Sequence, residues 1–183
     1  WDDMTDLPLA LRQQLEESVK MGNLALLEKK EGQEEWAKRF LWGRDDKPLC
    51  ESVLLSYKYG FSGCVSTQAG CPVGCAFCAS ALLGFERDLT YGEIIEEFMG
   101  MCRSQNERLG HLVFMGTGEP FLNYENVMAA VEALCDPGRY GLSRRKVTVS
   151  TVGVPPAMER FARERKGVRL ALSLHAPDDE TRN

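Results

Sequence analysis

The spacing of hydrophobic positions changes partway along this chain and predicts two parts with different structures. Residues 5–20 carry Leu7, Leu11 and Leu15, a spacing that predicts a helix. Residues 23–66 contain short apolar or alternating runs, separated by polar turn material such as EGQE and GRDDKP. This second pattern is typical of a small antiparallel meander.

Beyond the meander, apolar runs alternate with helical patterns. Thr90 with Glu93 forms a capping box at the start of the first helix, and Asn123 is the expected cap of the second. Prolines open the third helix. The predicted helices span 91–107, 122–135 and 155–166. The predicted strands are CVST (64–67), HLVFMG (111–116), KVTVST (146–151) and VRLALSLH (168–175).

Repeated strand–helix units of this length imply a parallel sheet with right-handed crossovers. The expected fold class is therefore α/β, a partial (β/α) barrel with about four parallel strands, preceded by a small α+β segment. We expect residues 1–59 to form an accessory region, itself truncated, and residues 60–183 to form the N-terminal part of the barrel. Four strands alone leave an exposed parallel edge, so we expect the C-terminal part of the barrel to lie outside this chain.

The composition is that of a globular protein, because 44% of the 183 residues are hydrophobic and 27% are charged. No apolar run reaches membrane-spanning length, and no signal or transit segment is visible. We therefore expect a cytoplasmic, monomeric protein whose cysteines are reduced and which does not bind a membrane. The net charge of −5 gives the chain as a whole no sign of nucleic-acid binding.

The charge is nevertheless uneven. Residues 144–169 contain eight basic side chains: Arg144, Arg145, Lys146, Arg160, Arg163, Arg165, Lys166 and Arg169. A basic face of this kind could contact phosphates. A solvated helix surface explains the same run equally well.

The sequence GCPVGCAFCAS is the most informative motif, since it places Cys71, Cys75 and Cys78 in C-x3-C-x2-C spacing. Three thiolates this close can hold three irons of a cubane [4Fe–4S] cluster, which leaves the fourth iron open to a ligand that is not protein. Gly70 and Gly74 allow the loop to turn tightly.

Three different roles for these cysteines stay open beside the cluster. A structural zinc site would need a fourth ligand, for which Cys64 is the candidate. A redox pair made by Cys75 and Cys78 would leave Cys71 without a role. A disulfide framework is disfavoured because the chain has an odd number of cysteines, seven.

In a (β/α) barrel the active site lies at the C-terminal ends of the strands, and the unusual polar residues of this chain follow its predicted strands. The turn GTGEP (116–120) combines a flexible backbone with Glu119, whose carboxylate can accept a hydrogen bond from an amino group. Ser150 closes one strand, and Ser173 and His175 close another. A plain turn, strand-end caps and a structural histidine account for each signal singly, but their shared location favours a site.

On these residues the chain resembles the radical S-adenosylmethionine (SAM) enzymes, through C-x3-C-x2-C followed by a GEP turn. It resembles more closely the RlmN/Cfr family of adenine-C2 (or C8) RNA methyltransferases, and within it the RlmN branch. The matching stretches are WDDMTDLPLALRQQL, GCVSTQAGCPVGCAFCASALLGFERDLTYGEII, VFMGTGEPFLNYENV, GLSRRKVTVSTVGV and LALSLHAPDDETRN, which cover essentially the whole chain.

The resemblance implies a role for each matching residue. Cys71, Cys75 and Cys78 would ligate the cluster, and SAM would chelate its open iron. Glu51 would act as a proton acceptor, and Cys64 would resolve a protein–RNA adduct by forming a disulfide with a cysteine of the C-terminal region. The implied SAM-binding residues are Gly118, Glu119, Ser150, Ser173, Leu174 and His175.

The resemblance also implies an activity, namely methylation of C2 of adenosine in 23S rRNA and tRNA through a methyl-cysteine. One SAM methylates that cysteine, and a second SAM yields a 5′-deoxyadenosyl radical with an electron from a donor such as flavodoxin or ferredoxin. The methyl-carrying cysteine belongs to the missing C-terminal region, so we expect the 183 residues alone to be inactive. This chain also has Thr117 where the family's MGMGEP turn usually has methionine.

Two alternatives stay open. Another radical SAM enzyme, catalysing C8 methylation or sulfur insertion, would share the cluster and the GEP turn. A non-catalytic iron–sulfur RNA-binding module would instead use the basic residues of 144–169 as its main functional surface.

Overall fold

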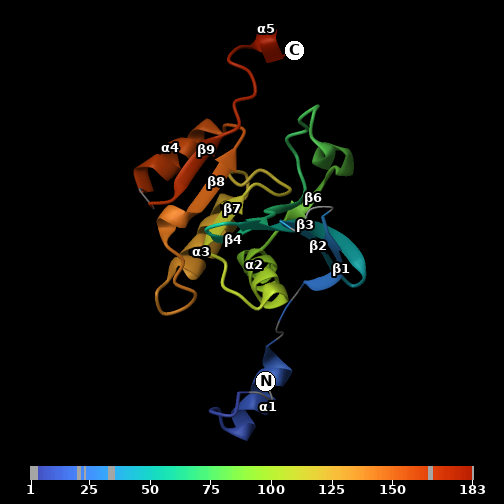
Figure 1. The fold of residues 1–183 in the computed structure, drawn as a ribbon, viewed down its shortest axis with the longest axis vertical. Helices are drawn as coiled ribbons and strands as arrows, with labels where there is room; N and C mark the ends of the chain where they lie inside the picture. Colours follow the sequence, from blue (N-terminus) through green and yellow to red (C-terminus); the bar gives the residue numbers. More distant parts are fainter. Residues whose placement is uncertain (1–3, 20–21, 23, 33–35, 165–166, 183) are drawn as a thin grey trace.

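A seven-stranded sheet forms the centre of the structure, with the strand order β1-β2-β3-β4-β7-β8-β9 (Figure 1). The computed structural model describes residues 4–19, 22, 24–32, 36–164 and 167–182. The strands of this sheet are β1 (Ala25–Glu31), β2 (Ala37–Arg44), β3 (Lys47–Tyr57), β4 (Gly60–Val65), β7 (His111–Phe114), β8 (Val147–Thr151) and β9 (Arg169–Leu172). The helices are α1 (Leu9–Ser18), α2 (Tyr91–Gln105), α3 (Tyr124–Cys135), α4 (Pro155–Glu164) and α5 (Asp179–Arg182).

The strand β4 joins two kinds of sheet. It pairs antiparallel with β3, where Val53 lies opposite Cys64, and parallel with β7, where Cys64 lies opposite Val113. The structure therefore confirms both the predicted meander and the predicted parallel strands, and it joins them in one sheet. The expected boundary after residue 59 falls in the turn between β3 and β4, across which the sheet continues. The division into two domains stays a prediction.

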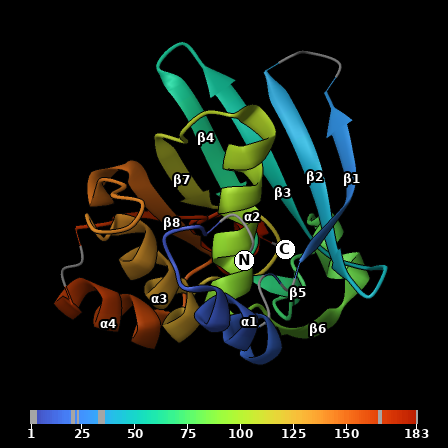
Figure 2. The same cartoon turned by 90° about the horizontal axis from the view of Figure 1, so that it is seen from below.

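The helices α2, α3 and α4 connect successive parallel strands, and Figure 2 shows them over one face of β4, β7 and β8. The core lies between these helices and the sheet. Phe98 and Met101 of α2, Val131 of α3 and Val149 of β8 are all fully buried in it. The predicted first helix is α1, which buries none of its residues. Within the described part of the chain, no helix is both long and apolar enough to cross a bilayer.

The capping box predicted for α2 is present. The Thr90 hydroxyl accepts a hydrogen bond from the Glu93 amide, and the Glu93 carboxylate accepts one from the Thr90 amide. Arg87 donates two further hydrogen bonds of 2.8 Å to the same carboxylate. The box therefore ties the helix start to the preceding strand as well as satisfying its amides.

The cap predicted at Asn123 is wrong in its chemistry. Asn123 occupies the N-cap position of α3, but its side chain makes no cap hydrogen bond. Its amide nitrogen instead donates to the carbonyls of Thr67 at 2.7 Å and Leu89 at 2.8 Å. Those two carbonyls are buried and need a hydrogen-bond donor. The Asn123 side chain therefore binds them instead of capping α3.

Three further features differ from the predicted elements. A short antiparallel pair, β5 (Gln68–Gly70) and β6 (Phe85–Asp88), flanks the cysteine loop together with the 3-10 turn η1 (Ala79–Leu83). The strand predicted over 168–175 ends as β9 at Leu172, and His175 has a positive φ of 62°. A second 3-10 turn, η2 (Arg144–Lys146), precedes β8.

Close packing between α2 and β2 predicts an unusual response to a glycine substitution. A Cβ at Gly100 would overlap the indole ring of Trp42, which is 4% exposed and donates to the Ser52 hydroxyl at 2.6 Å. Gly-to-Ala in a helix interior normally stabilises by about 1 kcal/mol. Here we expect Gly100→Ala to lower the free energy of unfolding by about 1–3 kcal/mol, because a well-packed core resists added volume. Urea unfolding measures the change.

Gly92 offers the matched control on the same helix. The nearest atom to a Cβ at Gly92 is the Thr90 hydroxyl oxygen, 3.9 Å away. Gly92→Ala should leave the free energy of unfolding unchanged or slightly higher. Equal effects of the two substitutions would contradict the packing argument.

Candidate active site

The three cysteines of the motif line one cavity at the C-terminal ends of the parallel strands. The cavity has a volume of about 290 Å³. The predicted site residues that line it are Cys71, Cys75, Cys78, Gly118, Glu119, Ser150 and Ser173. The structure therefore brings together residues from the cysteine loop and from the segments after β7, β8 and β9.

Backbone contacts shape the cysteine loop. Gly70 has a positive φ of 76°, and a Cβ there would overlap the carbonyl of Gly84. That carbonyl accepts a hydrogen bond of 2.9 Å from the Cys71 amide, and the Cys75 carbonyl accepts one of 3.0 Å from the Cys78 amide. The loop closes tightly only because residue 70 is glycine.

The donor set fits an iron–sulfur cluster. Burial raises the pKa of the Cys71 thiol, and Cys75 and Cys78 raise it further, so a thiolate here gains from a bound cation. Among the described residues no three histidine, cysteine or acidic side chains converge on a single metal ion. A cubane cluster takes each thiolate on a separate iron and does not require such convergence. Cys64 does not line this cavity, so the structure does not supply it as a fourth zinc ligand.

The GTGEP turn presents bare backbone to the cavity. A Cβ at Gly116 would lie 2.7 Å from both the Ser66 hydroxyl and the Val65 carbonyl. Gly118 has a positive φ of 107°, and a Cβ there would lie 2.6 Å from the Thr67 hydroxyl oxygen. That hydroxyl is buried and has no hydrogen-bond partner within the described residues. The turn thus combines close packing behind it with room for a ligand in front.

Glu119 is held rigidly in this turn. It is 2% exposed, and its two carboxylate oxygens accept hydrogen bonds from the amides of Phe121 at 3.0 Å and Val152 at 2.9 Å. Each oxygen retains a second lone pair for a ligand. The Glu119 amide donates to the side chain of Gln68 at 2.8 Å, and Gln68 donates to Asp88 at 2.7 Å.

Gln68 is a supporting residue that the sequence analysis missed. It is 1% exposed and connects the GTGEP turn to β6 through Glu119 and Asp88. The signal available in the sequence is the polar run STQ, which ends the predicted strand 64–67 and continues one residue past it to Gln68. Buried polar groups at such a position need partners, and a ligand-binding turn is one source of them.

The remaining predicted SAM-binding residues lie at or beyond the ends of β8 and β9. The hydroxyls of Ser150 and Ser173 are 3.1 Å apart, and both residues line the cavity. Leu174 and His175 do not line it. The His175 ring stacks on Phe77 with the ring centroids 4.3 Å apart, which connects the cysteine loop to the segment after β9.

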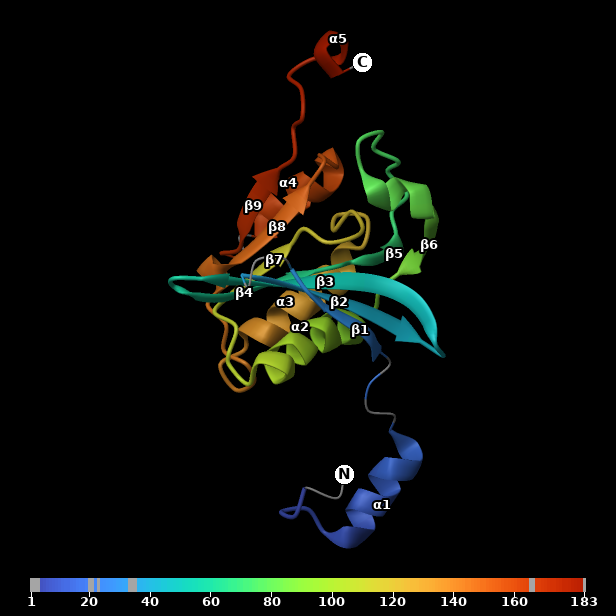
Figure 3. The same cartoon turned by 45° about the vertical axis from the view of Figure 1, so that its right-hand side comes forward.

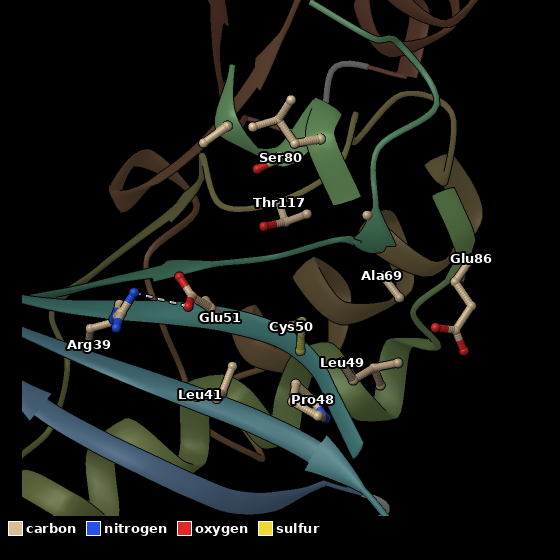
Figure 4. A pocket seen from close by; sticks show the side chains of 13 residues that line it. Arg39, Leu41, Pro48, Leu49, Cys50, Glu51, Ala69, Ser80, Glu86 and Thr117 are labelled. Carbon is tan, nitrogen blue, oxygen red and sulfur yellow. Dashed lines mark hydrogen bonds and ion pairs between the residues drawn. The ribbon is translucent and has the colours of Figure 1, made fainter. Parts of the chain in front are cut away.

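Glu51 lines a second, larger cavity of about 620 Å³ beside the first (Figure 4). Its carboxylate forms an ion pair of 3.2 Å with Arg39. Ser80 lines both cavities, and Thr117 lines the second while its glycine neighbours line the first. In Figure 4 Glu51 lies on the side of β3 that faces Ser80 and Thr117, and Cys50 lies on the other side. The two cavities therefore adjoin along the GTGEP turn.

Cys64 lines neither cavity but shares a sheet face with Glu51. Cys64 pairs with Val53, two residues from Glu51, so the Cα atoms of Glu51 and Cys64 lie about 7–8 Å apart. The neighbouring Gly63 faces α2, because a Cβ there would lie 2.9 Å from Met101. All seven cysteines are free in the structure, and the disulfide implied by the resemblance would need a cysteine that this chain lacks.

Three of the described residues of the predicted basic face are paired with acidic neighbours. Arg144 pairs with Glu132, and Arg160 pairs with Glu125. Arg163 lies 3.8 Å from an acidic side chain of its own helix. Arg165 and Lys166 lie outside the described residues. Among the described residues, the positive charge of the run 144–169 is therefore neutralised only in part.

Comparison with known proteins agrees with this geometry. The sequence pattern of the Radical SAM superfamily matches residues 65–183. The probable dual-specificity RNA methyltransferase RlmN of Thermotoga neapolitana is 40% identical over 183 residues, which cover 100% of this chain and 53% of that protein. The corresponding protein of Chloroflexus aurantiacus is 44% identical over 191 residues, covering 100% of this chain and 50% of that one.

One solved structure is also similar to this chain over nearly its whole length. The crystal structure of a radical SAM methyltransferase from Sphaerobacter thermophilus matches with a TM-score of 0.92 at 37% identity, covering 99% of this chain and 54% of that chain. The chain spans about half the length of the relatives it matches.

The tight packing behind Gly118 predicts that Gly118→Ala weakens SAM binding. The added Cβ must displace the turn from Thr67 and Gln68, so we expect at least about a tenfold loss of affinity with the iron content unchanged. Equilibrium dialysis on anaerobically reconstituted protein measures both. Gly60→Ala is the control, because Gly60 also has a positive φ but a Cβ there meets nothing within 4 Å. Unchanged SAM affinity in Gly118→Ala would contradict the packing argument.

The burial of Cys64 predicts slow alkylation. Burial raises its pKa to about 11 from the ordinary 9.0, so its thiolate fraction at pH 8 is about a hundredfold below that of an ordinary thiol. Since only the thiolate reacts, iodoacetamide labelling of Cys64 should still rise about tenfold per pH unit between pH 8 and 9.5. Peptide mass spectrometry measures the rate. A rate that levels off near pH 9, as in a cysteine-containing peptide, would contradict the raised pKa.

Proposed function

Because the chain belongs to the radical SAM superfamily, we propose that it supplies the cluster-binding and SAM-binding part of an RNA methyltransferase. One observation carries this proposal: the three cysteines, the GTGEP turn and two strand-end serines line a single cavity. The similarity to RlmN proteins over the whole chain supports adenosine C2 of 23S rRNA and of tRNA as the substrate.

In this proposal Cys71, Cys75 and Cys78 hold three irons of a [4Fe–4S] cluster. When bound, the cluster would supply the electron that cleaves SAM reductively. The chain's own contribution is to position SAM beside the cysteine loop. Glu119, fixed by two backbone amides, accepts a hydrogen bond from the amino group of SAM, while Gly118 lets the ligand approach the backbone.

The strand-end side chains complete the cavity. Ser150 and Ser173 offer hydroxyls to the polar parts of SAM, and Phe114 and Val152 provide apolar walls that restrict water. Leu174 and His175 act through the backbone segment that leaves β9, held against the cysteine loop by the contact of His175 with Phe77.

The adjoining cavity would receive the target adenosine. Its volume of about 620 Å³ lies within the usual range for small-ligand sites. Glu51 lines it and serves as the acceptor for the proton lost from the adenine ring, while Arg39 keeps the carboxylate in one position. Both residues line the same cavity as Thr117, whose glycine neighbours line the SAM cavity.

Cys64 would act after the methyl carbon has been joined to the base. Its sulfur would attack the sulfur of a protein–RNA adduct, so that a disulfide forms as the carbon–sulfur bond breaks. The electron pair of that bond would stay with the methylene carbon, which takes up a proton to become the methyl group. The raised pKa means that a base must first remove the thiol proton. The other cysteine of this step, the one that carries the methyl group, is not among the seven of this chain.

Several expectations belong to the same proposal. Residues 1–59 would form an accessory region and residues 60–183 the start of the barrel. A flavodoxin or ferredoxin would donate the electron, and the protein would act as a cytoplasmic monomer.

The test is the response of the cluster to SAM. After anaerobic reconstitution, we expect the reduced protein to give an electron paramagnetic resonance signal of a [4Fe–4S] cluster that shifts when SAM is added. Cys75→Ala should lose most of the iron and the signal. Cys102→Ala, on α2 and outside the cavity, is the control and should keep both. A stable cluster whose signal ignores SAM would refute the proposed site.

A further inference from the structure

Three aromatic rings lie together at the ends of the parallel strands opposite the cysteine cavity. Tyr57 ends β3, Tyr59 lies in the turn to β4, and His111 begins β7. The rings of Tyr57 and Tyr59 stack with their centroids 4.9 Å apart, and Tyr59 meets His111 edge-on at 5.2 Å. Tyr57 is 42% exposed and Tyr59 is 66% exposed. We refer to Tyr57, Tyr59 and His111 as the aromatic platform.

Cations flank this aromatic platform. Lys58 lies between the two tyrosines in the turn, Lys146 directly precedes β8, and Arg169 begins β9. The pairing of β7 with β8 and of β8 with β9 places the starts of these strands side by side. All three cations are exposed, and within the described residues none of them forms an ion pair.

Two of these cations, Lys146 and Arg169, affect the pKa of His111. Burial lowers the pKa of His111, and the positive charges of Lys146 and Arg169 lower it further. The ring is therefore neutral at pH 7, and its Nδ1 is buried without a hydrogen-bond partner in the described part of the chain. A neutral imidazole ring can stack with an unpaired base.

Lys58, Lys146 and Arg169 gather uncompensated positive charge at this end of the sheet. Elsewhere in the basic run, Arg144 and Arg160 are paired with acidic side chains. The chain as a whole carries a net charge of −5. Exposed tyrosine rings beside unpaired cations, on an otherwise acidic protein, form a specific feature rather than a general basic character.

We propose that the aromatic platform, with Lys58, Lys146 and Arg169, binds unpaired nucleotides of the RNA substrate. Tyrosine faces stack with any base, and the cations contact the phosphates between them. The proposal rests on the proposed function for its RNA substrate, and it adds a contact surface away from the chemistry.

The location of the platform sets the kind of RNA that reaches it. β4 runs from Gly60 to Val65 with a rise of about 3.3 Å per residue, so the platform lies roughly 20 Å from the cysteine loop. Figure 3 shows the β3–β4 turn projecting past α2 and α3, away from the cysteine loop. Only an RNA that extends several nucleotides beyond the target adenosine contacts both places.

Fluorescence anisotropy with two labelled RNAs tests the proposal. One is a tRNA stem-loop with its flanking nucleotides, and the other is a short oligonucleotide limited to the adenosine and its nearest neighbours. We expect Tyr59→Ala to weaken binding of the long RNA about tenfold and to leave the short one unchanged. Lys146→Ala should reduce the slope of log affinity against log salt by about one for the long RNA.

Tyr91→Ala is the matched control, because Tyr91 is another exposed tyrosine, at the start of α2, and is 52% exposed. It should bind both RNAs like the unmodified chain. The platform has no such role if Tyr59→Ala and Lys146→Ala both bind the long RNA as tightly as the unmodified chain does. An equal loss for both RNAs would also overturn the proposal. Failure of the unmodified chain to bind either RNA would instead contradict the RNA substrate of the proposed function.

Discussion

The backbone pairing of β4 on both of its edges is the constraint on which the rest of this structure depends. One edge pairs antiparallel with β3 and the other parallel with β7, so the N-terminal meander and the barrel strands share one pleated surface. Side chains alternate between the faces of a strand, and a shift of one residue would turn Cys64 toward Met101 of α2. The register of β4 therefore determines that Glu51 and Cys64 share a face, and that the cysteine loop starts at the same end of the sheet as the GTGEP turn.

Ser66, the first residue after β4, carries this constraint into the site. Its hydroxyl donates to the Glu51 carbonyl at 2.5 Å and accepts from the Thr117 amide at 2.9 Å, while its amide donates to Glu97 at 3.1 Å. Glu97 is fully buried, and burial raises its pKa well above the usual value. A buried network of this kind fixes the positions of both cavities relative to β4.

Sequence patterns predicted the elements that are strongly periodic or locally capped. The strands β7 and β8 and the helix α2 lie within a few residues of their predicted ranges, because buried runs and the capping box at Thr90 are local signals. The role of Asn123 was not predictable, since it depends on contacts with Thr67 and Leu89, which are far away in the chain. For the site, the motifs predicted seven residues that line the first cavity, and also Leu174 and His175, which do not line it. The place of Glu51 in a second cavity follows from strand register, which no local pattern contains.

The GTGEP turn has a consequence for how enzymes of this kind diverge. No larger residue fits at Gly116 or Gly118, because a Cβ there would overlap the backbone and side chains behind the turn. Between them, Thr117 anchors the turn through its carbonyl, which accepts from the amides of Thr67 and Gln68, and this anchor is independent of the side chain at 117. That side chain lines the Glu51 cavity alone. Position 117 is therefore where mutation can reshape the Glu51 cavity while the cavity of the three cysteines is preserved.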